Sequence, residues 1–160
     1  MTRRISFFCL TFLSIYILPP SSFGQLTNKN ADSIQVANTM TEFINVFSNL
    51  EWDKFIEFFS DSATAFFPPS SKYPYRANNK IEIEKIFKNF FENTKRQKLT
   101  GPYLIIKPKD LKIQLLNSIA IVTFMLDDPN LFGRRTFILE KHNDKWLIIH
   151  LHASGVPLVN

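Results

Sequence analysis

The stretch Lys145–Pro157, KWLIIHLHASGVP, decides which fold the chain builds. Large apolar side chains alternate with others along it, which is the period-2 pattern of a β-strand. Strict alternation would separate it into one face with Trp146, Ile148, His150 and His152 and a second face with Leu147, Ile149, Leu151 and Ala153. Because the second set is wholly apolar, we expect it to face the core or a cavity, and the two histidines to lie on the opposite face.

The same period continues upstream of this stretch, back to Gly101-Pro102. The short polar connection HND, residues 142–144, has the length and composition of a hairpin turn. The pattern predicts strands at 103–107, 111–115, 119–126, 134–141 and 145–153.

Before Gly101 the period is helical instead. Apolar residues recur every three or four positions, which predicts helices from Ser33 to about residue 50, over 51–59 and over 80–98. A short strand, ATAFF at 63–67, is stopped by Pro68-Pro69, and a loop follows at 70–79. The order of elements predicts an α+β fold, with three N-terminal helices packed on one face of a bent, mainly antiparallel sheet.

The N-terminus has the features of a secretory signal. Arg3 and Arg4 precede a mainly apolar run of twelve residues, Phe7–Leu18, which is shorter than the roughly 20 residues of a membrane span. We expect cleavage near Gly24, so that 1–24 is the signal peptide, 25–32 a flexible segment and 33–160 one exported, soluble domain, periplasmic or secreted. The paired arginines leave the twin-arginine route open as an alternative.

Composition narrows the classes of function. The one cysteine, Cys9, lies inside the predicted signal, so the exported domain would have neither a disulfide nor a thiol nucleophile. Residues 25–160 contain 17 basic and 14 acidic residues, a net charge of +3, and the basic residues are scattered. We therefore expect no nucleic-acid partner, and no membrane contact after cleavage.

The C-terminal residues resemble those of a known family. GRRTFILEKHNDKWLIIHLHASGVP and the earlier phrase NLEWDKFIEFFSDSATAFFPP are similar to the SnoaL-like branch of the nuclear transport factor 2-like superfamily. The end of the chain also resembles the association domain of calcium/calmodulin-dependent kinase II and its bacterial relatives, through Thr136, Trp146, His150, His152, Ser154, Gly155 and Pro157. The resemblance covers residues 33–160 and implies a cone-shaped fold, a cavity between helices and sheet, and a dimer or larger assembly built through the sheet.

Two positions depart from the kinase relative, whose cavity is lined by arginines right after the threonine and between the second histidine and the serine. Phe137 and Ala153 stand there in this chain. Arg135 instead shares a strand face with Phe137, where it would anchor a carboxylate if that face lines the cavity. The alternative is a structural ion pair with an acid such as Glu140 or Asp127.

The expected cavity is apolar, and its expected ligand is a small apolar molecule or a carboxylate. Its candidate lining residues are Trp52, Phe55, Phe66, Tyr103, Phe124, Arg135, Phe137 and Ile149. His150 and His152 are expected to be structural or to lie at a subunit interface. We expect no metal, because a zinc site needs a third ligand and His142, in the turn, is badly placed.

The sequence leaves open whether the protein is an enzyme. Enzymes of the superfamily, such as ketosteroid isomerases, dehydratases and polyketide cyclases, use an Asp or His as acid or base in an apolar cavity. The acids that could serve are Asp53, Asp61, Asp127 and Asp128, and capping or turn formation accounts for each of them. We therefore expect a binding or assembly module, homodimeric and without a cofactor, with a cofactor-independent isomerase, cyclase or dehydratase as the alternative.

Overall fold

The computed structural model describes residues 23–68, 76–97, 100–128 and 131–157. Only the last two residues of the predicted signal peptide fall within these ranges. No helix in them is both long and apolar enough to span a membrane.

Three helices, α1 (Phe23–Ser48), α2 (Trp52–Glu57) and α3 (Lys80–Gln97), are described. α1 begins ten residues before the expected Ser33, so the segment 25–32, which we expected to be flexible, is helical. At the end of this segment, buried Asp32 lies 2.6 Å from Nζ of Lys141 and so ties α1 to the sheet. α2 is shorter than predicted, since Phe59 already belongs to the next strand.

The sheet has six strands: β1 (Phe59–Phe66), β2 (Arg76–Ala77), β3 (Lys109–Leu116), β4 (Ile119–Asp128), β5 (Leu131–His142) and β6 (Lys145–Pro157). Their order is β2-β1-β6-β5-β4-β3. β1 and β6 are parallel, whereas every other neighbouring pair is antiparallel. The sheet is therefore mixed, and the strand that carries the two histidines lies between β1 and β5.

One predicted strand and the predicted role of one residue were wrong. Residues 103–107 form no strand, because the amides of Tyr103 and Leu104 both donate to the carbonyl of Ser48 at the end of α1, at 2.9 and 3.0 Å. Asp61, which we expected at a capping or turn position, lies inside β1 with an exposed side chain.

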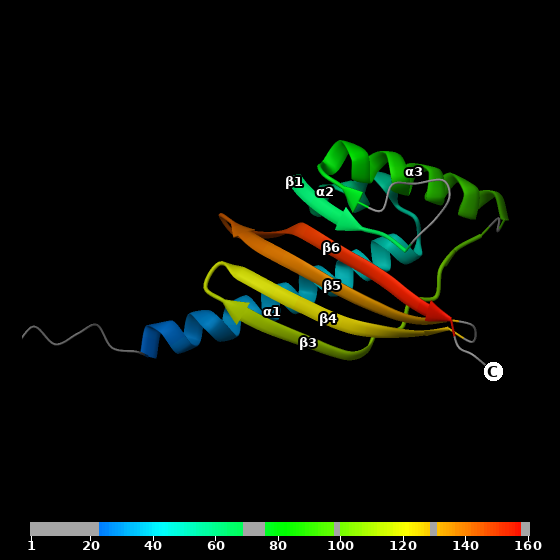
Figure 1. The fold of residues 1–160 in the computed structure, drawn as a ribbon. Helices are drawn as coiled ribbons and strands as arrows, with labels where there is room; N and C mark the ends of the chain where they lie inside the picture. The colour runs from blue at the N-terminus through cyan, green and yellow to red at the C-terminus, as the bar shows by residue number, and fades with distance from the viewer. Residues whose placement is uncertain (1–22, 69–75, 98–99, 129–130, 158–160) are drawn as a thin grey trace, which may run out of the picture.

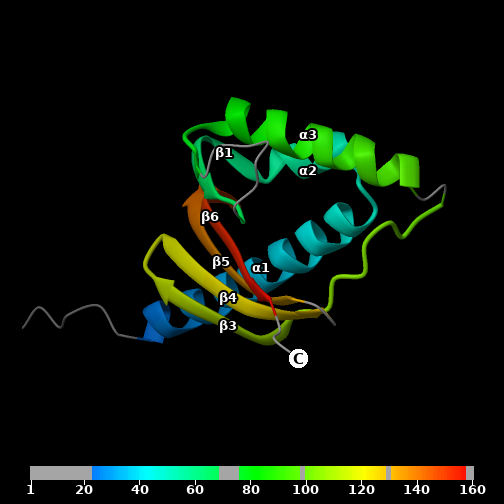
Figure 2. The ribbon, with the colours of Figure 1, turned by 45° about the vertical axis from the view of Figure 1, so that its right-hand side comes forward.

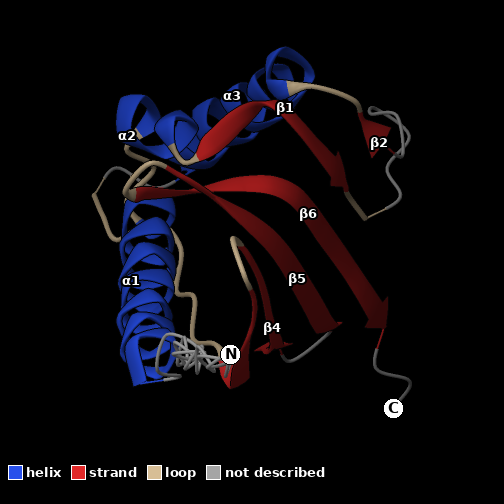
Figure 3. Ribbon diagram, turned by 90° about the vertical axis from the view of Figure 1, so that its left-hand side faces the viewer, coloured by secondary structure: helices blue, strands red, loops and turns tan. Residues whose placement is uncertain are grey.

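All three helices lie on one side of the sheet. In Figure 1, α1 runs behind β3–β6, and α2 and α3 lie together beyond β1. Figure 2 shows the same layers from a second direction. In the side view of Figure 3, α1 and the α2–α3 pair are on one side of the sheet, and among the described elements no helix covers the other side of β4–β6. We call this uncovered side the open face.

Phenylalanine rings fill the space between the helices and the sheet. Phe55 of α2 is fully buried, and its ring centroid lies 4.7 Å from that of Phe87 and 4.9 Å from that of Phe91, both on α3. Phe43 of α1 contacts Phe137 of β5 at 5.2 Å. These rings join α1, α2 and α3 to the sheet in one core.

Candidate functional site

The residues expected to line a cavity lie in three different environments. Phe55, Phe124 and Phe137 are buried in the core, where the rings of Phe124 and Phe137 stack at 5.7 Å. Trp52 and Tyr103 are half-buried at the margin of the same core. The structure places aromatic rings in mutual contact where we expected these residues to surround a ligand.

Phe66 and Ile149 do not lie with the other expected cavity residues. Leu139 pairs with Ile148 and Ile138 pairs with His150, so Ile149 has no partner on β5 and forms a β-bulge. The extra residue reverses the alternation, because Trp146 and Ile148 are buried before it and Leu151 and Ala153 after it. The expectation of two strictly alternating faces along β6 was therefore wrong at its N-terminal half.

The two histidines lie on the open face, next to Phe66. The ring centroid of Phe66, whose side chain is 39% exposed, lies 5.7 Å from that of His150 and 5.8 Å from that of His152. The hydroxyl oxygen of Thr64 lies 2.8 Å from Nδ1 of His150. Partial burial, and then the nearby His152, lower the pKa of His150 below its ordinary value of 6.5.

Across β1, β6, β5 and β4, the centre of the open face contains no acidic or lysine side chain, and exposed Lys112 of β3 stands next to Thr123 at its edge. Strand pairing arranges the side chains of the open face in rows that cross β1, β6, β5 and β4. Apart from Phe66 and His152, these side chains are half-buried although no described helix lies over them. The rows consist of Thr64, His150, Ile138 and Ile121, and of Phe66, His152, Thr136 and Thr123.

Among the described side chains, Arg135 is not paired with Glu140, one of the two acids that we considered. Its Nη1 donates to the carbonyl oxygens of Arg134 and Ser154, at 2.8 and 2.9 Å. Glu140 instead lies 2.7 Å from His142, and the side chain of Asp127 lies outside the described part of the chain. Burial lowers the pKa of Arg135, so this guanidinium is a desolvated cation held by backbone oxygens.

Of the four acids considered for catalysis, Asp53 and Asp61 have described side chains, and both lie away from the aromatic core. Asp53 is exposed in the first turn of α2, and Asp61 lies 3.8 Å from Lys80 at the surface. Asp128, like Asp127, is described only in its backbone, as part of β4. Within the described ranges, no three His, Cys, Asp or Glu side chains are grouped so that they could hold a metal ion.

A pocket that the sequence did not predict lies between α1, α2 and the β5–β6 turn. Its volume is about 410 Å³, and none of the eight expected cavity residues lines it. Glu42 comes from α1, Lys54 and Glu57 from α2, and Asp144 and Trp146 from the hairpin. Periodicity could not reveal this pocket, because its walls come from three separate elements.

Solved structures with low sequence identity share this fold. An NTF2-like protein of unknown function from Pseudomonas putida KT2440 is 15% identical, covering 78% of this chain and 87% of its own, with a TM-score of 0.65. A candidate dehydratase of the NTF2-like family from Streptomyces avermitilis is also 15% identical, covering 82% and 99%, with a TM-score of 0.64. A candidate calcium/calmodulin-dependent protein kinase II association domain from Xanthomonas campestris is 23% identical, covering 78% and 87%, with a TM-score of 0.54.

These likenesses establish the fold as NTF2-like, α+β with a mixed sheet. No curated protein matches the chain. The family model of the SnoaL-like domain matches residues 36–159, from the middle of α1 to beyond the end of β6. The match confirms the resemblance carried by the C-terminal residues, and the chain belongs to the SnoaL-like domain family.

Proposed function

We propose that this protein is an exported assembly module without its own catalysis, which forms a homodimer through the open face of its sheet. The observation that carries the proposal is the composition of that face. Its central rows are Thr, Ile, Phe and His side chains, all uncharged when the imidazoles are neutral. A solvent-facing sheet surface ordinarily carries charged residues, and their depletion is typical of the centre of an interface.

A second copy of the chain suits this face as its occupant. In a twofold dimer each residue of the patch meets a residue of the same patch, so a neutral surface presents no like charges to its copy. Arg134 and Glu140 lie on the same side of β5, beyond the neutral rows, and supply opposite charges at the rim. The similar Xanthomonas campestris protein, a candidate association domain, supports self-association as the role of such a fold.

The interior supports assembly over catalysis. An acid or base working in this fold needs space for a substrate beside it. Here the core positions are occupied by contacting phenylalanine rings. A carboxylate held by Arg135 is a separate part of the proposal, because among the described residues the hydrogen bonds of that guanidinium go from Nη1 to two backbone carbonyls.

Export is proposed from the N-terminal sequence. Arg3 and Arg4, the run Phe7–Leu18 and the small residues before Gly24 support cleavage and release into the periplasm or the medium. Mass spectrometry of the protein recovered from those fractions would give the new N-terminus, expected near Gln25. Recovery of the uncut chain in the cytoplasm would contradict export.

A charge placed on the open face tests the assembly. Ile138→Glu should convert the dimer to a monomer, because two carboxylates would be buried near each other at the interface. Ile34→Glu is the matched control, since Ile34 is 62% exposed on α1, on the helix side. Light scattering after size-exclusion chromatography measures both masses, and an unchanged mass for folded Ile138→Glu would contradict the proposed interface.

A further inference from the structure

The pocket between α1, α2 and the β5–β6 turn is held in shape by contacts that fasten α1 to the hairpin. Asp32 of α1 lies 2.6 Å from Nζ of Lys141, and both side chains are largely buried. One turn further along α1, the side-chain oxygen of Gln35 accepts a hydrogen bond of 3.3 Å from Nε1 of Trp146. These contacts fix the relative positions of two of the three walls.

The floor of the pocket is apolar and its rim is polar. Trp146 is only 3% exposed, and Phe58 and Leu147 are half-buried beside it. Exposed polar side chains of α1 and α2 surround this floor. A volume of about 410 Å³ lies within the range of small-molecule sites, roughly 300 to 1,000 Å³.

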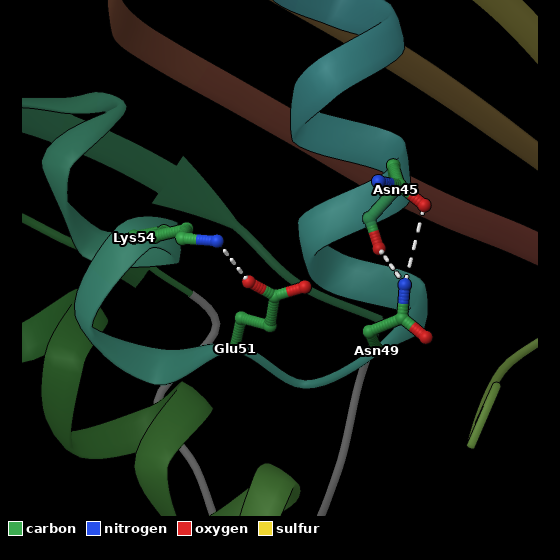
Figure 4. A network of polar contacts seen from close by, with 4 residues as sticks. All are labelled: Asn45, Asn49, Glu51 and Lys54. Atoms are coloured by element: carbon green, nitrogen blue, oxygen red, sulfur yellow. Dashed lines mark hydrogen bonds and ion pairs between the residues drawn. The ribbon is translucent and has the colours of Figure 1, made fainter.

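Acidic groups outnumber the free cations at the rim. Glu42, Glu57 and Asp144 line the pocket, and none of the three has a hydrogen bond or ion pair within the described residues. Lys54 is held 2.6 Å from Glu51, which is not itself a lining residue (Figure 4). Lys145 is the other lysine of the lining, so the local charge is negative.

The environment of Lys54 agrees with this excess of negative charge. Its hydrogen bond to Glu51, and then the charge of Glu51, raise the pKa of Lys54, and Glu42 adds to the effect. A lysine already bonded to one carboxylate and close to another attracts an anionic ligand only weakly. The field at the rim therefore favours a cation.

We propose that this pocket binds a small organic cation, an amine whose ammonium group lies among Glu42, Glu57 and Asp144 while its flat apolar part rests on Phe58 and Leu147, next to buried Trp146. Charge complementarity fixes the ammonium end, and the aromatic floor favours a ring or alkyl portion beside it. The pocket lies on the helix side of the sheet, so this site does not depend on the open face or on dimer formation.

Three probes that share one ring and differ in charge test the ligand class: benzylamine, benzyl alcohol and benzoate. Calorimetry at low ionic strength gives each affinity, and the indole N–H resonance of Trp146 reports whether the pocket is occupied. We expect benzylamine to bind about fivefold tighter than benzyl alcohol, benzoate not to bind, and the Trp146 resonance to shift. Equal affinities for the amine and the alcohol, no binding of benzylamine, or an unshifted resonance would each overturn the proposal.

Substitutions at the rim locate the charge that matters. Glu42→Gln combined with Asp144→Asn should weaken benzylamine binding by about threefold, within the fivefold advantage of the amine over the alcohol, because two of the three exposed attractions are lost. Glu92→Gln combined with Asp110→Asn is the matched control, since both are surface acids on α3 and β3, outside the lining. Equal affinity of the rim variant and the control variant for benzylamine would show that the rim carboxylates do not hold the ligand. That result would contradict the proposal.

Discussion

Thr64 of β1 and His150 of β6 meet across the one parallel strand pair of the described sheet, with Oγ1 and Nδ1 2.8 Å apart. This contact fixes the imidazole on the open face, beside the rings of Phe66 and His152. The contact joins β1 to β6, so His150 has a structural role in the sheet. It also holds a titratable group at the centre of the proposed interface.

The stability of the protein should fall as the pH falls below about 6.5, because of His150. Its pKa is lowered in the folded state, so between that lowered value and 6.5 the unfolded chain binds more protons than the folded one. The contribution of neutral His150 is thus complete above pH 6.5 and is lost as the pH falls through this window. Urea unfolding at pH 7.5, 6.5 and 5.5 should give a smaller pH dependence for His150→Gln than for the parent.

His142→Gln serves as the control for that comparison, because His142 lies at the β5–β6 turn, 2.7 Å from Glu140 and away from the open face. It should leave the contribution of His150 in place. An identical pH dependence in the parent and His150→Gln would mean that the environment of His150 does not penalise its charge.

Phe55→Ala should destabilise the protein by about 3 to 5 kcal/mol, since a fully buried ring in contact with several others is removed. Phe90→Ala should cost less than half as much, because Phe90 is 39% exposed on α3. Urea unfolding measures both. A loss below about 1 kcal/mol for Phe55→Ala would indicate that Phe55 borders open space and not a packed core.

Arg135→Leu should cost about 1 to 3 kcal/mol, because the hydrogen bonds to the Arg134 and Ser154 carbonyls are lost while a desolvated charge is removed. A buried ion pair with an acid would cost more when broken, roughly 3 to 5 kcal/mol. The control is Arg134→Leu, whose exposed guanidinium lies 5.8 Å from the ring of Phe132.

Thermal melts with benzoate test whether Arg135 also anchors a carboxylate. Stabilisation of the parent by benzoate, absent in Arg135→Leu and present in Arg134→Leu, would support the anchor. No shift of the parent's melting temperature at millimolar benzoate would count against it.

The order of elements could be predicted from the sequence because each long element keeps one period. The 3.6-residue stripe of α3 and the alternation of β4 and β5 each bury one face in the structure. Residues 103–107, YLIIK, misled the prediction, since this apolar run is not a strand and the amides of Tyr103 and Leu104 bond to the end of a helix. The spacing of apolar residues in the sequence indicates which side chains are buried. It does not indicate which groups the backbone amides bond to.

The residues of the open face were harder to predict than the order of elements, because their positions depend on the pairing register of β6 with β5 and β1. The run Leu147-Ile148-Ile149 contains three consecutive apolar residues, and this break in the alternation was the one signal of the bulge at Ile149. Phe66 belongs to the open face because β1 pairs in parallel with β6, a long-range pairing that no local pattern encodes. The pocket at the β5–β6 turn likewise arises where α1, α2 and the hairpin meet.

Sedimentation equilibrium at pH 7.5 and pH 5 tests the central claim, self-association through the open face. Neutral imidazoles allow two copies of the face to meet, whereas charged His150 and His152 would place like charges in the interface. We expect the mass of a dimer at pH 7.5 and a shift toward monomer at pH 5, with folding at both values checked by circular dichroism. A monomer at both pH values, with the protein folded, would contradict the account.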